Sequence, residues 1–171
     1  NKNEFINFFE DSSLPTIIYI GRLTKTKKLP ILIEAIKILN QKKINYNLLI
    51  VGDGEEQRFL ENTYNSLIDK GWVHFYGNCF DDKKTSKLIY HSDLCVSPGN
   101  IGLTAIHSLS YGTPVASHNN FNNQMPEVEA IIEGENGFLF EEDNSNDLAI
   151  QINSWFLNNS NVNKDLIRKI I

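Results

Sequence analysis

Short apolar runs alternate with helical patterns six times along the chain, and this alternation constrains the fold more than any other feature of the sequence. Each run is continuous, as expected of a strand covered on both faces. The runs lie at residues 16–20, 47–51, 73–77, 94–98, 114–118 and 137–140. Helical spacing of apolar residues begins near residues 29, 59, 81, 103, 126, 148 and 165. The pattern predicts an α/β fold with a doubly wound, six-stranded parallel sheet and helices on both faces.

Composition excludes several classes of protein. With 41% hydrophobic and 22% charged residues, this chain of 171 residues is expected to be globular and to bury a full core. A net charge of −5 argues against a general nucleic-acid binder, which needs a broad cationic surface. No apolar run approaches the roughly 20 residues of a membrane span, and the opening residues lack a signal-peptide pattern. Cys79 and Cys95 form neither a disulfide framework nor a zinc pattern, so we expect a reducing cytoplasm.

Three segments are expected along the chain. Residues 1–15 carry Phe5, Phe8 and Phe9 at helical spacing and are predicted to form a short helix leading in from a preceding domain. Residues 16–160 make up the sheet-containing domain. Residues 161–171 are predicted to be a C-terminal helix that packs on the preceding domain.

The segment 97–115 is the strongest candidate for a binding site. A strand ends there, the chain turns through Gly99, Asn100 and Gly102, and a helix follows that stops at Gly112. Ligands of doubly wound sheets bind beyond the carboxyl ends of the strands, and the N–H groups at a helix start attract anions. The alternative is a structural turn whose glycines provide only tight geometry.

A dense basic group follows the first strand. It consists of Arg22, Lys25, Lys27 and Lys28. A guanidinium fork together with a mobile ammonium suits a diphosphate. The alternative is a solvated lysine turn, which explains the lysines better than it explains Arg22.

Other candidate residues carry weaker signals. The GDG at residues 52–54 lacks the remaining glycine of a dinucleotide fingerprint and is predicted to be a tight turn opening a helix. The four histidines have no metal-ligand spacing, so no metal is expected. His74 and His91 are predicted to be structural, whereas His107, about one turn past the proposed anion site, is open to either reading. Glu127 and Glu129 are expected to favour a helix start electrostatically.

Taken together, these motifs resemble the C-terminal, donor-binding half of a GT-B-fold retaining glycosyltransferase of glycosyltransferase family four. YIGRLTKTKKLPILIEAI is similar to the family's G-R-L-x-x-x-K-G opening, and LLIVGDGEE, HFYGN, SDLCVSPGNIGLTAIHSLSYGTPV and PEVEAIIEGENGFLF resemble later segments in the same order. The resemblance implies that Arg22 and Lys27 act on the donor diphosphate as catalytic residues. The implied donor-binding residues are Gly21, Asn78, Cys79, Gly99, Asn100, Ile101, Gly102, Leu103 and His107, with Asn78 and Cys79 in the nucleobase loop.

Three positions depart from the family pattern. Lys28 stands where the family has a glycine, and Gly99 and His107 stand where it has two glutamates, the first near the donor sugar and the second on the ribose. A neutral imidazole accepts only one hydrogen bond, whereas a carboxylate accepts from both ribose hydroxyls. Either the site is rebuilt around backbone donors at residues 100–103 with His107 on the ribose, or it no longer transfers sugar.

The resemblance implies a hexosyltransferase that moves sugar from a UDP- or GDP-linked donor to a glycan or lipid-linked acceptor, with retention and without a metal or other cofactor. Such an enzyme serves polysaccharide biosynthesis in the cytoplasm, peripheral to the inner face of the membrane through its N-terminal domain. The C-terminal half is expected to be inactive without that domain. The alternative is a non-catalytic nucleotide-sugar-binding or scaffold subunit, motivated by Gly99 and His107.

Overall fold

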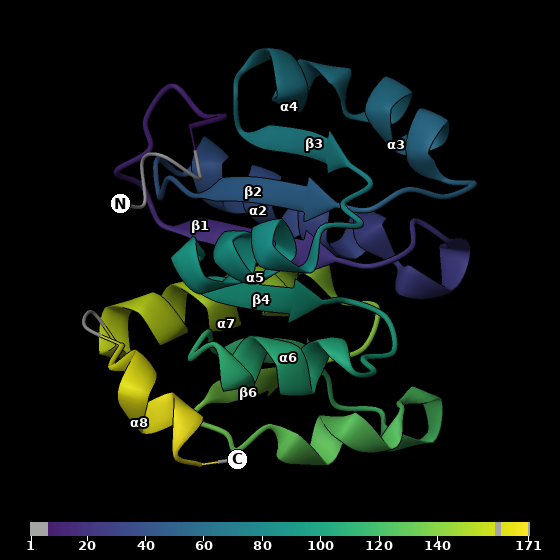
Figure 1. The fold of residues 1–171 in the computed structure, drawn as a ribbon. Helices are drawn as coiled ribbons and strands as arrows, with labels where there is room; N and C mark the ends of the chain where they lie inside the picture. Colours follow the sequence, from purple (N-terminus) through teal and green to yellow (C-terminus); the bar gives the residue numbers. More distant parts are fainter. Residues whose placement is uncertain (1–6, 160–161, 171) are drawn as a thin grey trace.

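The computed structural model describes residues 7–159 and 162–170 and shows one six-stranded sheet (Figure 1). All neighbouring strands are parallel, in the order β3-β2-β1-β4-β5-β6, so the strand order reverses between β1 and β4. The strands are β1 (Thr16–Ile20), β2 (Asn47–Val51), β3 (Val73–Gly77), β4 (Leu94–Ser97), β5 (Val115–His118) and β6 (Gly137–Phe140). The predicted doubly wound α/β fold is therefore confirmed.

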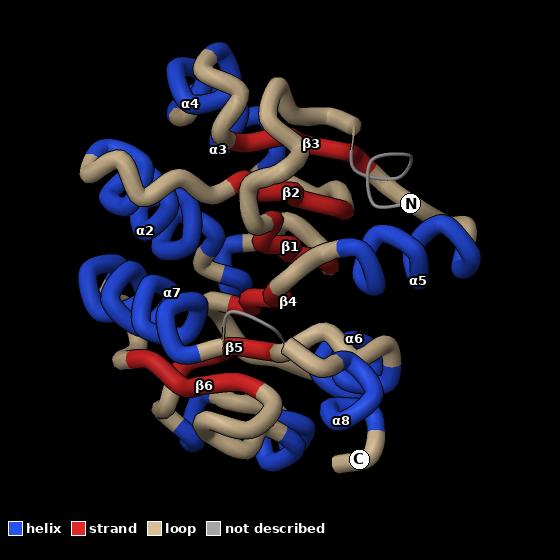
Figure 2. The backbone as a smooth tube through the Cα atoms, turned by 90° about the vertical axis from the view of Figure 1, so that its left-hand side faces the viewer, coloured by secondary structure: helices blue, strands red, loops and turns tan. Residues whose placement is uncertain are grey.

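Helices cover both faces of the sheet. Figure 2 shows α2 and α7 on one face and α5, α6 and α8 on the other. The α-helices are α2 (Leu29–Gln41), α3 (Gln57–Thr63), α4 (Asn65–Asp69), α5 (Asp82–His91), α6 (Thr104–Ser110), α7 (Ser145–Asn158) and α8 (Lys164–Arg168). Three short 3₁₀ segments are η1 (Lys25–Lys27), η2 (Phe121–Asn123) and η3 (Pro126–Ala130). Among the described residues, no helix is long and apolar enough to cross a membrane.

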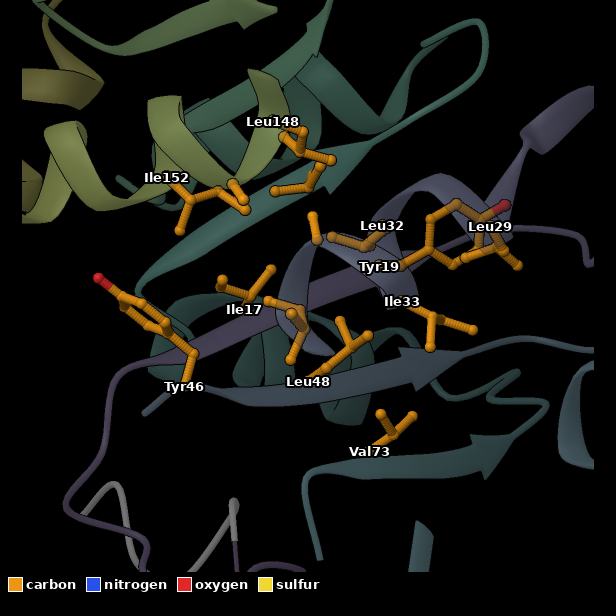
Figure 3. Packing of buried hydrophobic residues seen from close by; sticks show 14 of the residues in the cluster. Ile17, Tyr19, Leu29, Leu32, Ile33, Tyr46, Leu48, Val73, Leu148 and Ile152 are labelled. Carbon is orange, nitrogen blue, oxygen red and sulfur yellow. The ribbon is translucent and has the colours of Figure 1, made fainter. Parts of the chain in front are cut away.

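Alternation along the strands divides the core into two layers. Ile17 and Tyr19 of β1 point toward α2 and α7, whereas Ile18 belongs to the layer under α5 and α6. Figure 3 shows the first layer, in which Leu32 of α2 and Leu148 of α7 meet the strands. The two layers fix the sheet from both sides, so the loops at the carboxyl ends of the strands start from rigid supports.

The helical predictions are wrong in three places. The predicted helix near 59–68 is interrupted at Tyr64, whose backbone is not helical. The segment starting at Pro126 forms only η3, because the Asn136 side chain donates to Ala130 O and accepts from Ile132 N. Residues 7–13 are not helical; Phe8 instead stacks on His74 at 4.6 Å between ring centroids. Residues 1–6 lie outside the described part of the chain.

The C-terminal helix α8 lies against α6 of this same domain. Ile167 is buried there, and Lys164 Nζ donates to Ser92 O at 3.2 Å and to Thr113 Oγ1 at 3.1 Å. The expected contact of residues 161–171 with a preceding domain stays a prediction.

Candidate functional site

The loops after β1, β2 and β3 are joined by backbone hydrogen bonds. Gly21 N donates to Val51 O at 3.0 Å, and Gly52 N donates to Gly77 O at 2.8 Å. A Cβ atom on Gly52 would lie 1.9 Å from Gly21 O, so only glycine allows these two loops to approach. The GDG segment is thus a structural turn, as predicted.

A hollow of about 220 Å³ lies over these three loops, and we call it the β1–β3 hollow. Four of the predicted site residues line it together: Gly21, Arg22, Asn78 and Cys79. The other lining residues are Ile20, Val51, Gly52 and Asp53. The sequence placed these residues on separate loops, and the sheet brings them to one point.

The residues of the β1–β3 hollow are held by a small number of side-chain contacts. Tyr19 Oη donates to Arg22 O at 2.7 Å, which fixes the backbone of Arg22 while its side chain stays exposed. Asn78 Nδ2 donates to Asp53 Oδ2 at 3.0 Å. The hollow therefore presents a guanidinium, an amide and a carboxylate to a ligand.

Lys27 follows Arg22 in the loop after β1 and contacts the turn formed by residues 99–103. Its Nζ donates to Asn100 O at 2.9 Å and to Asn100 Oδ1 at 2.8 Å. Burial lowers the pKa of the Lys27 ammonium. A Cβ atom on Gly99 would lie 2.1 Å from Thr26 O, so the turn packs directly on η1. Two residues predicted for the site, Lys27 and Asn100, are thus in contact, with the oxygens of Asn100 bound to the ammonium.

Backbone donors of the 99–103 turn fall into two groups. Ile101 N donates to Gln124 Oε1 at 2.9 Å, so this amide is already occupied. In the described part of the chain, the N–H groups of Gly102 and Leu103 make no recorded hydrogen bond, and Leu103 is exposed. Gln124 was missed by the sequence reasoning, and the polar character of NNFNNQM was the only signal pointing to it.

Lys28 adopts the left-handed conformation that a family glycine would supply, with φ 52°. Its ammonium pairs with Glu142 Oε1 at 2.7 Å and with Asp143 Oδ1 at 2.8 Å, and Asp143 is itself left-handed at φ 60°. Glu142 also accepts from Asn123 Nδ2 at 2.9 Å and from Asn120 Nδ2. The hydrogen bond from Lys28, followed by those from the two asparagines, lowers the pKa of Glu142 to about 2.

The histidines occupy separate environments. His107 is exposed on α6, and no hydrogen bond of its side chain is recorded among residues 7–159 and 162–170. His118 is buried at the end of β5, where burial lowers its pKa and its Nε2 lies 3.9 Å from Glu142 Oε1. Within the described residues, no group of three potential ligands could hold a metal.

Two larger hollows share no lining residue with the β1–β3 hollow, although Lys25 and Lys28 of the predicted basic group line one of them. That hollow, of about 270 Å³, combines apolar residues of α2 and α3, such as Leu29 and Leu60, with charged residues such as Lys28 and Asp143. The other, of about 520 Å³, lies between Glu133, before β6, and α7 residues such as Gln151 and Trp155. Size alone therefore does not single out a hollow. The β1–β3 hollow gathers a cation and an amide from separate loops, and the Lys27–Asn100 contact joins the loops on the two sides of the strand-order reversal.

The six-stranded parallel sheet with helices on both faces is the α/β fold found in C-terminal domains of GT-B-type glycosyltransferases. Residues 1–170 match the description "Glycosyl transferases group 1", and the chain belongs to that family. An uncharacterised 41.2 kDa protein of the cps region of Klebsiella pneumoniae is 26% identical over 156 residues. The match covers 90% of this chain and 40% of that protein, so the chain spans less than half of this relative.

Solved structures show the same fold at low sequence identity. The C-terminal domain of LpcC, a glycosyl transferase group 1 protein of Francisella tularensis, is 21% identical with a TM-score of 0.72. That match covers 99% of this chain and 87% of the other. Anabaena HepE in complex with UDP is 20% identical with a TM-score of 0.74, covering 98% of this chain and 45% of HepE.

Proposed function

We propose that this chain is the donor-binding half of a retaining glycosyltransferase of family four, holding a UDP- or GDP-linked sugar. One observation carries the proposal. Arg22, Asn78 and Cys79 line one hollow at the carboxyl edge of the sheet, and Lys27, in the same loop as Arg22, contacts Asn100 after β4. The nucleobase would lie by Asn78 and Cys79, and the diphosphate would lie between Arg22 and Lys27.

Binding of the diphosphate requires Lys27 to exchange partners. Its ammonium would give up the two Asn100 oxygens and take phosphate oxygens instead. Charged oxygens are stronger acceptors than a carbonyl or an amide, and a phosphate would also favour the protonated ammonium, whose pKa burial lowers. The N–H groups of Gly102 and Leu103 would supply further donors to the same anion.

The proposed chemistry is electrostatic. As the glycosidic bond breaks, the nucleoside diphosphate leaves with the electron pair, and Arg22 and Lys27 stabilise the charge that develops on it. The hydroxyl oxygen of a glycan or lipid-linked acceptor forms the new bond on the same face of the sugar, and its proton passes to an oxygen of the departing diphosphate. The family resemblance suggests the retention of configuration, the hexosyl donor and the absence of a metal or cofactor.

The remaining expectations concern the whole protein. The acceptor would be held by the N-terminal domain, which would also provide any peripheral contact with the inner face of a membrane, and the enzyme would work in the cytoplasm. This half would bind donor without turning it over. Polysaccharide biosynthesis is the process that such a transfer would serve.

A second candidate is a non-catalytic nucleotide-sugar-binding or scaffold subunit. Gly99 and His107 replace both expected glutamates, and a side chain at Gly99 is excluded by Thr26 O. The full-length protein would then bind nucleotide sugar without transferring it.

Thermal unfolding of the chain with a panel of UDP- and GDP-sugars tests the binding step. A ligand at 100 times its dissociation constant stabilises by about 2.7 kcal/mol, so a clear rise in Tm is expected for one base. No rise with any member would contradict the donor-site assignment. Sugar transfer by the full-length protein to an acceptor then separates the enzyme from the scaffold, because only the enzyme gives product.

A further inference from the structure

The loop after β5, residues 119–125, holds the 99–103 turn through the side chain of Gln124. Gln124 Oε1 accepts from Ile101 N at 2.9 Å. Its Nε2 donates to Ser117 Oγ at 2.8 Å and to His118 O at 2.9 Å. Both ends of the amide are therefore engaged with fixed parts of the fold.

Ser117 extends this hold to the other end of the turn. Its Oγ donates to Ser97 O at 2.9 Å and lies 3.2 Å from Gly99 O as a second acceptor. Ser117 is fully buried in β5 and pairs with Ser97 at the last registered position between β4 and β5, so it is a rigid support. The turn is thus attached at Gly99 through Ser117 and at Ile101 through Gln124.

Lys27 contacts the same turn from η1. Because its ammonium binds Asn100, the residue between the two attachment points, the turn is held from two sides. If Lys27 transfers to a diphosphate, the turn loses the hydrogen bonds from Lys27 and keeps the packing of Gly99 on Thr26. Gln124 and Ser117 then supply the side-chain hydrogen bonds that still hold the turn.

We propose that Gln124 is a positioning residue that keeps the 99–103 turn in the conformation that receives the donor diphosphate. This inference rests on the proposed function. Gln124 does not touch the diphosphate, since its oxygen and its nitrogen are both engaged within the protein. Its contribution is to fix Ile101 so that the next N–H groups, of Gly102 and Leu103, point at the anion.

The chemistry of the position requires a glutamine. The side chain must accept from an N–H and donate to a carbonyl at the same time, which an amide does and a carboxylate cannot. Methionine has a similar length and shape but forms neither strong hydrogen bond. Gln124→Met therefore removes the hydrogen bonds while largely keeping the packing.

The position of Gln124 predicts a selective loss. The β1–β3 hollow is lined by residues of three other loops, none of which binds Gln124. Gln124→Met should therefore weaken binding of a nucleoside diphosphate, which needs the turn, about tenfold. Binding of the matching monophosphate should change by less than about twofold, because the terminal phosphate group is missing. The tenfold factor corresponds to the loss of about one hydrogen bond between the turn and the diphosphate.

The test is calorimetry on this chain with UDP and UMP, and with GDP and GMP, for wild type, Gln124→Met and Asn122→Ala. Asn122 is the matched control, since it is exposed in the same loop and its side chain makes no recorded hydrogen bond among the described residues. We expect a selective loss of diphosphate affinity in Gln124→Met alone. Equal losses for both nucleotides, or no loss, would overturn the proposed role.

Hydrogen exchange of the Ile101 amide tests its hydrogen bond to Gln124 without any nucleotide. Exchange should be at least about tenfold faster in Gln124→Met and unchanged in Asn122→Ala, because an amide without its acceptor is protected less. Unchanged Ile101 exchange would also overturn the inference. If wild type binds none of the nucleotides while Ile101 exchange responds as expected, the proposed function fails and the turn is held for another purpose.

Discussion

The two halves of the carboxyl edge of the sheet are built differently. On the β1–β3 side the loops are joined by backbone hydrogen bonds, such as the one from Gly21 N to Val51 O, and they leave a hollow. On the β4–β6 side the loops are joined by side chains, among them Gln124 and Glu142, and the 99–103 turn is closed against η1. We call the β1–β3 side the open half and the β4–β6 side the interlocked half.

This difference shows where the sequence can reshape the site. Backbone hydrogen bonds form with almost any side chain, so the β1–β3 half tolerates substitution as long as its close-approach glycines remain. Side-chain hydrogen bonds depend on individual residues. The departures from the family pattern are Gly99 and His107, which follow β4, and Lys28, which follows η1 and pairs with Glu142 and Asp143 after β6. If the proposed donor site is correct, its departures from the family pattern all touch the interlocked half.

The largest effect is expected from Arg22→Ala, which tests the open half. Hydrogen bonds to charged groups contribute about 1.5–3 kcal/mol, so affinity for UDP or GDP should fall by up to roughly 100-fold. The Arg22 side chain is exposed, so the fold should stay intact. Calorimetry gives the affinity, and Lys25→Ala, an exposed cation on the same loop, is the control. Equal losses in the two variants would mean that net charge, not the hollow, attracts the nucleotide.

Gly99→Ala tests how tightly the other half is closed. The new methyl group would lie 2.1 Å from Thr26 O, so the turn or η1 must move, and overpacking of this kind costs about 1–3 kcal/mol. Urea unfolding measures the loss. Gly102→Ala is the matched control, because a Cβ atom there meets nothing within 4 Å. If both variants are equally stable, the turn is not closed against η1.

A smaller effect is expected from His107→Ala. If the imidazole donates one neutral hydrogen bond to the ribose, its loss costs about 0.5–1.5 kcal/mol, or roughly threefold to tenfold in UDP affinity. His91→Ala, on α5, should leave the affinity unchanged. Similar affinities for wild type and His107→Ala would remove His107 from the site.

The smallest effect is expected from Glu142→Gln. Glu142, after β6, binds Lys28 in the loop after β1 and Asn120 and Asn123 in the loop after β5. Because its side chain is partly exposed, these contacts contribute little to stability. Its pKa is lowered to about 2 from an ordinary 4.5, so the unfolded chain binds more protons between these values. The stability that Glu142 contributes is therefore complete above about pH 4.5 and is lost as the pH falls toward 2. Tm measured against pH should fall less steeply over this range in Glu142→Gln than in wild type. If Tm falls equally steeply in both proteins as the pH drops, Lys28, Asn120 and Asn123 do not lower the pKa of Glu142.

The sequence predicted the strands because each is a continuous buried run bounded by glycine or polar residues. Arg22, Asn78 and Cys79 could be placed near one another for the same reason, since the carboxyl ends of parallel strands share one edge. Gln124 could not be found in this way. Its partner Ile101 is 23 residues away, and their contact depends on how the β5 loop folds back over β4. Likewise, η3 replaces a predicted helix because the Asn136 side chain binds Ala130 O, a contact that the spacing of apolar residues does not predict.

The placement of the two cysteines gives the open half a built-in reporter. Cys95 is fully buried in β4, and burial raises the pKa of its thiol to about 11, so it resists alkylation at neutral pH. Cys79 lines the β1–β3 hollow and is only partly covered. A thiol-reactive fluorophore should therefore label this chain at one site, and protection of that site by a nucleotide would report occupancy of the hollow without an acceptor, a coupled assay or any sugar transfer.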